Sequence, residues 1–502
     1  MKKFIIALCA LAAVLSSCSK DFINPRHNSS EPLDEYFNTP ERLYQCLVAA
    51  YDPLQWYDYF YQYDNLHLIF DVMGDDVYAG GSDDGDQPLI VKTHYYTATS
   101  TDVCNMFWTI NYSGINRAAT VIKYIDGAEG VTEETKKLYV AEAKVLIAYY
   151  YNMLWKLWGN VPYWEELLEA PYICEQLPAD EVYANFIKLL EDAIDMNVLP
   201  MKAAGGSEGR VTKAMAYMLF TEAVLYQNDQ SRYQKALGYM QEIINSGQYS
   251  LVSDFAGIWE ETGEWGPESI WEINYISEGG RHTWDAPIAT GGAVTPILTG
   301  IPALKDPSDT YQEGWGFGTI AKSAYDMFDD DDIRKDGGIL NFAKWAETSG
   351  ASYTPRWQDT GFFNKKYIAR KNGNHGYVII NSDNLNYGNN ERIYRYAETL
   401  LNAAELSVLL GQDGSSYLKQ VRDRANCHDT GVTRDDIIQE RHKEFVGEGK
   451  RYWDLVRTGQ AATVLKAANH EYRTVDWTPN KKYWPIPQTE IDKDPSLTQN
   501  NY

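Results

Sequence analysis

The sequence is short of positive charge. Lys and Arg together number 45 against 70 Asp and Glu, which gives a formal net charge of −25. A surface this acidic repels the phosphate backbone of nucleic acids and excludes them from the expected partners. Neutral and cationic ligands remain compatible with it.

Sequence motifs of metal and nucleotide sites are also missing. His470-Glu471 lacks the second histidine of HExxH, and the acidic run at 329–332 does not fit the ligand spacing of an EF-hand. The sequence contains neither GxSxG nor a P-loop, so we expect no cofactor and no metal. The carboxylate pair of a glycoside hydrolase stays open, because 70 acidic residues make close pairs inevitable by chance.

Cysteine is scarce beyond the first residues, and none of it forms a CxxC pair. Cys46, Cys104, Cys174 and Cys427 are widely spaced. We predict buried free thiols, and a disulfide remains an alternative whose pairing the sequence does not fix. The same part of the chain has no stretch of 18 apolar residues, which excludes a membrane-spanning helix there.

The chain begins with a targeting segment. Two lysines precede an apolar run from Phe4 to Leu15 that is too short to span a bilayer. The run ends in Leu-Ser-Ser-Cys, the pattern of a bacterial lipoprotein signal, and an ordinary secretory signal with a coincidental cysteine is the alternative. We predict that residues 1–17 are removed and that Cys18 is acylated, so that lipid is the membrane attachment of residues 18–502.

Apolar residues recur at helical spacing in several segments. One long helix is predicted from Thr132 to Trp158, and Thr212 is predicted to cap another. Two close helix pairs, each joined by a short polar turn, resemble tetratricopeptide hairpins. The first helix of the second pair is predicted to include Ile393 and Ala404.

The fold expected from these patterns is mainly α, with tetratricopeptide-like helical pairs packed against an irregular, loop-rich binding region with few short strands. An N-terminal segment runs from about 30 to 210, and the tetratricopeptide-like helices occupy 132–247 and 391–458. The irregular region spans about 248–390, where Gly, Pro, Asn and Trp are frequent. Within it, the alternating run from Glu268 to Tyr275 predicts a strand.

One segment resembles an acid–base site at first sight. ERHKEFVGEGKRYWDLVRTG, at 440–459, alternates acids and bases. Thr433 predicts the start of a helix that Gly447 and Gly449 break, and the arginines and carboxylates are expected to form ion pairs around Trp453 that fix how helices dock. The segment has no nucleophile and no base without an arginine nearby. We interpret it as structural rather than catalytic.

The same segment resembles the C-terminal signature of the SusD/RagB family, and further motifs of that family follow one another along most of the chain. The later residues depart from the family pattern only in Lys493-Asp494-Pro495, where Asn-Pro is usual, and in the lack of a glycine before Tyr502. The matching residues are Asp34–Thr39, Ala49–Tyr51, Ala141–Lys144, Ala148–Tyr151, Gly159–Pro162, Gly209–Lys213, Arg395–Leu401, Glu440-Arg441, Glu444-Phe445, Glu448-Gly449, Arg451, Asp454-Leu455, Arg457, Pro485–Gln488, Glu490–Asp492, Leu497–Asn500 and Tyr502.

The resemblance implies a non-catalytic binding protein that is lipid-anchored in a gram-negative outer membrane and faces the cell exterior. Such proteins act as the lid of a SusC-like, TonB-dependent transporter, to which they deliver captured oligosaccharide. Two alternatives remain: a surface glycoside hydrolase lipoprotein, and a lid that captures peptides, as RagB-like members do.

The resemblance also implies that loops after the first helix and in the irregular region form the ligand site. The chain has 38 Tyr and 15 Trp, and aromatic planes stack on the apolar faces of sugar rings while carboxylates and guanidinium groups bind the hydroxyls. Trp155, Trp158 and Trp271 are predicted to lie in the core. The candidate ligand-binding residues are Trp56, Asp75, Asp76, Tyr78, Arg281, Trp284, Tyr311, Trp315 and Trp357.

Overall fold

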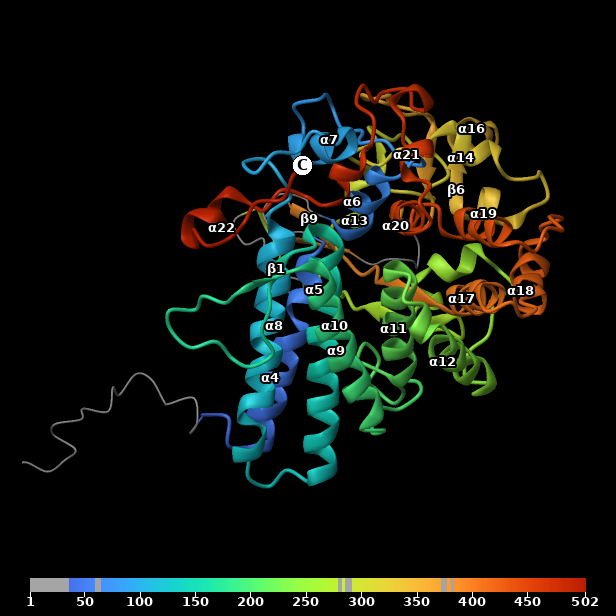
Figure 1. Ribbon diagram of the computed structural model, residues 1–502. Coiled ribbons are helices and arrows are strands. Elements are labelled where there is room, and N and C mark those ends of the chain that lie inside the picture. The colour runs from blue at the N-terminus through green and yellow to red at the C-terminus, as the bar shows by residue number, and fades with distance from the viewer. Residues whose placement is uncertain (1–35, 59–64, 279–281, 285–290, 372–376, 381–382) are drawn as a thin grey trace, which may run out of the picture.

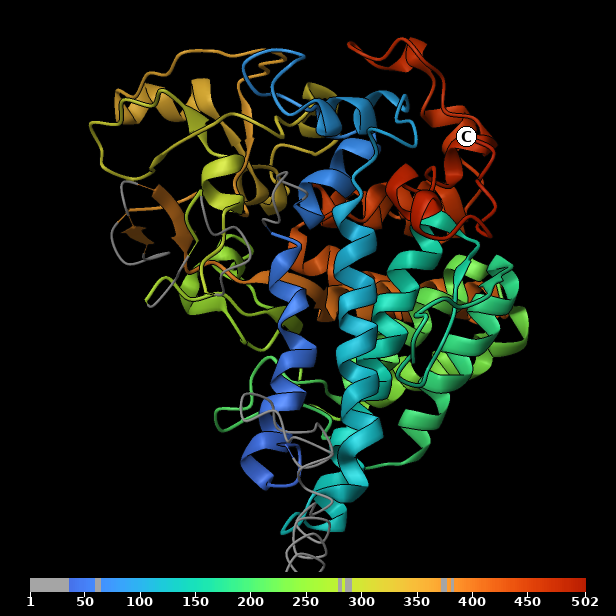
Figure 2. The same cartoon turned by 90° about the vertical axis from the view of Figure 1, so that its left-hand side faces the viewer.

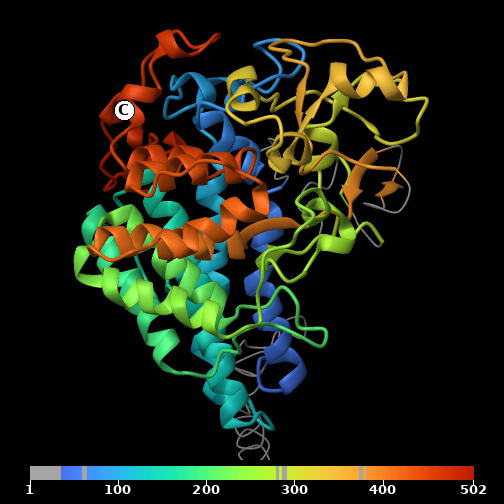
Figure 3. The same cartoon turned by 90° about the vertical axis from the view of Figure 1, so that its right-hand side faces the viewer.

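Helices dominate the structure, a computed structural model that describes residues 36–58, 65–278, 282–284, 291–371, 377–380 and 383–502. The strands are few and short, which confirms the predicted mainly α fold. Figures 2 and 3 show a helical body with the loop-rich residues 248–390 gathered at one upper corner of it. Within the described residues, no helix combines the length and the apolar character needed to cross a bilayer.

The N-terminal part of the helical body is built on long helices that lie side by side (Figure 1). α8 packs against both α4 and α9, and α10 packs on α9. Gly114 permits the close approach of α8 to α9, because a Cβ there would lie 2.2 Å from the ring of Tyr150. The helices of this part are α4 (Pro40–Tyr51), α5 (Pro53–Trp56), α6 (Leu66–Met73), α7 (Pro88–Tyr95), α8 (Met106–Tyr124), α9 (Glu133–Trp158) and α10 (Ala179–Asp195).

Helix α9 begins and ends where the sequence predicts. The Thr132 hydroxyl accepts a hydrogen bond from the Thr135 backbone N–H at 3.1 Å, and two glutamates in the first turn favour the helix dipole. Gly159 ends the helix with a φ of 69°. Trp155 and Trp158 are buried in the core, as predicted.

Two helix pairs form the tetratricopeptide-like part, and α12 of the first pair packs against α17 of the second. Thr212 caps the first pair as predicted, accepting from the Met215 N–H at 3.1 Å. The prediction that Ile393 belongs to a helix is wrong: Ile393 lies in a strand, and the helix begins at Tyr396. The helices are α11 (Lys213–Gln227), α12 (Tyr233–Asn245), α17 (Tyr396–Leu409) and α18 (Ser415–Ala425).

Strand β10 holds Ile393 because it pairs with β3, the strand predicted at 268–275. The two strands are antiparallel, with Glu391 opposite Ile273 and Arg395 opposite Ser269. Both strands are buried along their whole length. The apolar residues of β10 therefore fit a buried strand as well as the buried face of a helix, and their spacing alone does not distinguish the two. This pairing, which we call the clasp, is formed by β3 (Ser269–Ile273) and β10 (Glu391–Arg395).

The residues between the two strands of the clasp form short elements joined by loops. The described residues of this region contain four short helices, of which α16 is the longest. The elements are α13 (Thr295–Leu298), β4 (Ile301–Pro302), β5 (Glu313–Gly314), α14 (Lys322–Asp326), α15 (Ile333–Gly338), β6 (Ile339–Asn341), α16 (Phe342–Ser349), β7 (Phe362–Asn364), β8 (Tyr377–Ile380) and β9 (Asp383–Tyr387), while β1 (Val161–Pro162) pairs with β2 (Gln176–Leu177) outside this region.

The C-terminal helices return to the helical body. Thr433 and Asp436 form a capping box at the start of α19, and the helix ends before Gly447 and Gly449, which have φ values of 77° and 69°. Both observations confirm the prediction for this segment. The helices are α19 (Arg434–Phe445), α20 (Arg451–Arg457), α21 (Ala461–Val464) and α22 (Gln488–Lys493).

The four cysteines of the described residues are free thiols. Cys46 and Cys104 are buried, as predicted for all four. Cys174 and Cys427 are partly exposed instead.

Candidate functional site

Three loops bring three tryptophans to one part of the surface. The Gly81 N–H donates to the Gly316 carbonyl at 3.0 Å, and the Trp357 N–H donates to the Gly81 carbonyl at 3.2 Å. The backbone at 74–86 therefore lies between the loop of Trp315 and the loop of Trp357. We call Trp284, Trp315 and Trp357 the tryptophan surface.

Trp284 and Trp315 form a stacked pair within this surface. Their rings stack with centroids 5.8 Å apart and an interplanar angle of 25°. Trp284 is 48% exposed, while Trp315 and Trp357 are partly buried against the hydrophobic core. A stacked pair with one ring in solvent offers an aromatic face on which a ligand can stack.

The loops approach each other closely because glycine occupies the crossing point. Gly80 has a φ of 70°, and a Cβ at this position would lie 2.3 Å from the Gly316 carbonyl oxygen. A side chain at position 80 would push the two loops apart and displace Trp315 from its place beside them.

Two polar residues beside Trp357 fix the loops, and the sequence predictions did not include them. Gln358 is buried, accepts from the Gly80 N–H at 3.1 Å and donates to the Tyr95 hydroxyl at 3.2 Å. Arg356 is exposed and donates to the Trp315 carbonyl at 2.9 Å, which leaves its remaining N–H groups beside the tryptophans. Their only signal in the sequence is their position next to a tryptophan in an irregular segment.

Three of the other candidate residues have structural partners. Asp75 receives two hydrogen bonds from Arg451, at 2.8 and 3.0 Å, and Asp76 pairs with His442 at 2.7 Å. Trp56 packs against the core beneath the guanidinium of Arg117, 4.9 Å from the ring centroid.

Two further candidates are buried and one lies outside the described residues. Tyr78 is buried edge-on against Tyr472. Tyr311 is buried in a small core with Trp345. Arg281 lies outside the part of the chain that the structure describes.

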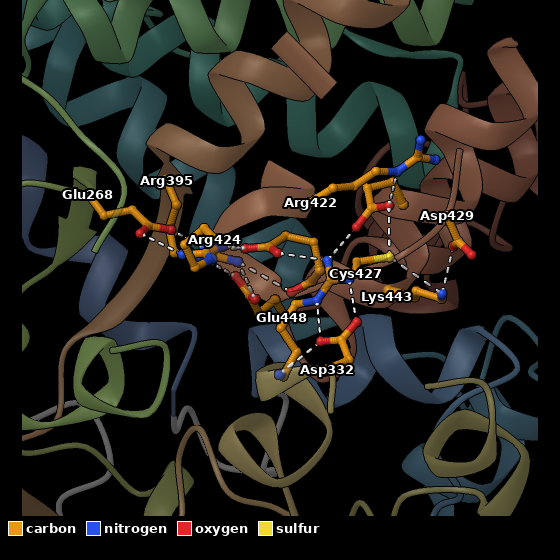
Figure 4. A network of polar contacts seen from close by, with 12 residues as sticks. Glu268, Asp332, Arg395, Arg422, Arg424, Cys427, Asp429, Lys443 and Glu448 are labelled. Atoms are coloured by element: carbon orange, nitrogen blue, oxygen red, sulfur yellow. Dashed lines mark hydrogen bonds and ion pairs between the residues drawn. The ribbon is translucent and has the colours of Figure 1, made fainter. Parts of the chain in front are cut away.

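The acids and bases at 440–459 enter a buried network of ion pairs (Figure 4). Glu444 contacts Arg395 at 3.0 Å and Arg334 at 3.1 Å, and it also pairs with Arg424. These side chains are at most 4% exposed. We call the following residues the charge cluster: Glu268, Arg334, Arg395, Arg424, Glu440, Glu444 and Glu448.

The cluster stabilises the charged forms of its carboxylates. Burial alone would raise the pKa of Glu444, but Arg424, Arg395 and Arg334 outweigh it and hold that pKa well below its usual range. A second set of ion pairs joins Asp454 to Arg441 at 2.9 Å and to Arg457 at 2.7 Å, beside Trp453. Carboxylates held charged by bound arginines are poor proton donors at neutral pH, which agrees with a structural role for the segment.

Two carboxyl groups with raised pKa values, Asp58 and Glu391, lie together in the core. Burial, with the nearby Asp58 carboxyl, raises the pKa of Glu391 to about 8. Asn65 and Thr295 bridge the two acids, and both acids are at most 1% exposed. A ligand in solvent does not reach either of them, so their pKa values do not mark a catalytic site.

Two clusters in the described structure bring together side chains of the kind that bind metals. Asp75, Asp76 and His442 form one, and Cys427, Asp429 and Glu440 form the other. A cation is already present in each, because Arg451 binds Asp75 and the Lys443 ammonium lies 2.7 Å from Asp429. These internal ion pairs account for both clusters.

Two protein families match different parts of the chain. The family described as "SusD family" matches residues 341–502. The family described as "Starch-binding associating with outer membrane" matches residues 21–223.

Solved structures match over nearly the whole chain. Surface glycan-binding protein A from Bacteroides thetaiotaomicron, in complex with laminarihexaose, is 43% identical, with a TM-score of 0.86 over 93% of this chain and 100% of that one. Surface glycan-binding protein A from Bacteroides uniformis is 42% identical, with a TM-score of 0.83 over 92% and 99%. A laminarin-binding SusD-like protein is 27% identical, with a TM-score of 0.80 over 92% and 99%. This chain therefore belongs to the SusD family of surface glycan-binding proteins.

Proposed function

We propose that this protein is a non-catalytic, lipid-anchored receptor that captures β-1,3-linked glucan chains of the laminarin type at the cell surface. The captured chain passes to a SusC-like, TonB-dependent transporter, on which this protein acts as the lid. The single observation that carries the proposal is the exposed, stacked pair of Trp284 and Trp315.

Stacking explains how such a surface holds a neutral sugar. The C–H face of a glucose ring packs on the indole plane, and each such contact contributes about 0.5–1.5 kcal/mol beyond the area that it buries. Arg356 supplies N–H donors for the sugar hydroxyls from its place beside Trp315. Several modest contacts together give an affinity that permits release to a transporter, since a very slow dissociation would block transfer.

The choice of glucan rests on the comparison with relatives. The protein from Bacteroides thetaiotaomicron that is 43% identical was solved with laminarihexaose, and the relative at 27% identity is described as laminarin-binding. The stacked pair of Trp284 and Trp315 is consistent with the same class of ligand here.

The anchor and the partner rest on the sequence. Cys18 follows a lipoprotein signal, and acylation there would tether the described body to the outer membrane through the residues before α4. The family described as associating with the outer membrane matches from residue 21 onward, which supports this location.

The first experiment separates binding from turnover. Lipid-free protein is run in native gels that contain laminarin, starch or other soluble glycans, and the reaction mixtures are assayed for reducing ends. We expect laminarin alone to retard migration, with no increase in reducing ends. Release of reducing ends that disappears when one Asp or Glu is replaced would identify a hydrolase and overturn the proposal.

The second experiment tests the tryptophan pair itself. Trp315→Ala is expected to lower the affinity for laminarihexaose about tenfold, as the loss of one stacking contact predicts. Trp315→Phe keeps an aromatic plane and should retain much of the affinity. Tyr44→Ala is the matched control, because Tyr44 is 46% exposed on the distant α4. Equal affinity of Trp315→Ala and the wild type would exclude this pair as the binding surface.

A further inference from the structure

A second aromatic groove lies between α8, the loop from β1 to β2, and α22. It has a volume of about 580 Å³, which is within the range of ligand sites. Figure 1 shows the loop and α22 both beside α8. None of the three tryptophans of the tryptophan surface lines this groove.

An aromatic platform forms one wall of the groove. The rings of Tyr112 and Trp164 stack with centroids 4.9 Å apart and an interplanar angle of 12°. The Tyr112 hydroxyl donates to the Pro162 carbonyl at 2.9 Å, which holds its ring in place. The backbone N–H of Trp164 donates to the Tyr151 hydroxyl at 2.7 Å, which fixes the backbone that carries the second ring. The stack is therefore formed before any ligand arrives.

A stripe of polar side chains on α8 lies beside this platform. Thr109, Ser113 and Asn116 follow one another at spacings of four and three residues, so they share one face of the helix and all line the groove. Within the described part of the chain, their side chains make no hydrogen bond. They offer hydroxyl and amide groups that both donate and accept, which suits the hydroxyls of a sugar.

The opposite wall adds acidic groups and an exposed ring. Glu490 and Asp494 come from α22 and the residue after it. Tyr172 is 72% exposed, although its φ of 62° lies in the left-handed region that bulky residues avoid. The loop thus carries an aromatic ring at the edge of the groove, in a conformation that costs free energy to hold.

We infer that this groove is a second glycan-binding site, separate from the tryptophan surface, that takes neutral oligosaccharides of the same class. The inference rests on the proposed function, because it assumes that a glycan is the ligand. Stacking on Tyr112 and Trp164 and hydrogen bonds to the α8 stripe supply the recognition. A long polysaccharide that occupies both sites is held more tightly than either site alone would hold it, because the second contact is intramolecular.

A native thiol in the groove reports on this site. Cys174 lines the groove and is partly exposed, while Cys427 is also partly exposed but lies next to Glu440 in the interior network. The probe is laminarihexaose, and the readout is the alkylation rate of each cysteine, followed by mass spectrometry. At a ligand concentration three times the dissociation constant, a groove-bound ligand slows the reaction of Cys174 about fourfold. Cys427 should react at an unchanged rate.

Variants separate the two sites. In Trp284→Ala/Trp315→Ala, protection of Cys174 should persist, although retardation by laminarin in native gels weakens. In Asn116→Ala and in Tyr172→Ala, both at exposed positions, protection should fall while retardation remains largely unchanged. Tyr44→Ala should alter neither.

Three outcomes would overturn the second site. Protection of Cys174 that disappears in Trp284→Ala/Trp315→Ala would make the groove dependent on the first site. No protection of Cys174 in wild-type protein that laminarin still retards would remove the second site and leave the proposed function intact. Protection of Cys174 by a purified SusC-like transporter, and not by laminarihexaose, would identify the groove as a protein interface.

Discussion

The charge cluster and the tryptophan surface differ in their exposure to solvent. In the cluster, Glu444 and its arginines are almost fully removed from solvent, and each of these arginines also pairs with at least one other carboxylate. In the tryptophan surface, Trp284 keeps nearly half of its area in solvent, and its partner is a neutral ring. Removing one member of the cluster leaves buried charges unpaired, whereas removing one tryptophan removes a neutral ring.

This difference separates the residues that identify the family from the residues that we propose to bind the ligand. The arginines and carboxylates of the signature fix the position of α19 and α20 against β10 and α15. Such a set is difficult to change one residue at a time, because each single change leaves an unpaired buried charge. Exposed aromatic residues in loops are free of that constraint and can differ between relatives with different ligands.

The largest expected effect comes from the centre of the cluster. Glu444→Gln keeps the shape of the side chain but leaves Arg395, Arg424 and Arg334 with one negative charge fewer among them. We expect the free energy of unfolding to fall by about 3–5 kcal/mol. Urea unfolding followed by circular dichroism measures this. A loss below about 1 kcal/mol would contradict the assigned role of the cluster.

Acid should weaken the ion-paired region in a defined range of pH. Burial opposes ionisation of Asp454, but Arg441 and Arg457 outweigh it and lower its pKa from 3.8 to about 2. Because the folded-state pKa is below the unfolded one, this stabilisation is complete above about pH 5 and is lost as the pH falls toward 2. One group shifted in this way contributes about 2 kcal/mol.

The measurement is the urea midpoint between pH 6 and pH 3. The urea midpoint of the wild type should decline between pH 5 and pH 3. The decline should be shallower in Asp454→Asn, because this variant lacks the carboxyl group that titrates. Laminarihexaose binding by folded protein should stay constant between pH 7 and pH 5, since stacking on tryptophan involves no titrating group. A tenfold change in the affinity for laminarihexaose between pH 7 and pH 5 would contradict this, because it would show that a titrating group takes part in binding.

Gln358 belongs to both kinds of region, because it is buried and yet holds the loops of the tryptophan surface. Gln358→Ala leaves the buried Gly80 N–H without its acceptor, which we expect to cost about 1–3 kcal/mol of stability. It should also lower the affinity for laminarihexaose severalfold, because Trp357 and the loop at 79–81 lose a shared anchor. Calorimetric titration at a temperature where the variant is fully folded tests the second effect.

The smallest effect should come from an exposed ion pair. Lys419 and Asp423 pair across one turn of α18, and their side chains are 71% and 61% exposed. Replacing Lys419 with alanine should change the free energy of unfolding by about 0.5 kcal/mol or less, since water screens such a pair. The same urea titration as for Glu444→Gln makes the two ion pairs directly comparable.

Helical periodicity and caps made much of the fold predictable from the sequence. Thr132, Thr212 and Thr433 all cap the helices predicted for them, and β3 lies within the predicted strand. Ile393 was misplaced because apolar spacing does not distinguish a strand buried on both faces from a helix face. The pairing of β10 with β3 decides that case, and it joins residues more than a hundred positions apart.

The site was less predictable, because residue type does not tell whether an aromatic or acidic side chain faces solvent. Asp75 and Trp284 were candidates on equal terms, yet Arg451 binds Asp75 while Trp284 is exposed. Arg356 and Gln358 had no pattern of their own, since their roles come from backbone groups of distant loops. Whether the tryptophan surface binds glycan stays a prediction.

The clasp has a consequence for how this protein could acquire new ligands. Because β3 and β10 are adjacent, the chain leaves the helical body at Ile273 and re-enters it at Glu391, directly opposite. The loops of an excursion whose ends meet can change in length and sequence without moving the helices on either side, as long as α15 keeps the pairs of Arg334 with Glu440 and Glu444. Trp284, Trp315 and Trp357 lie in such loops, so these loops could be exchanged while the helical body stays in place.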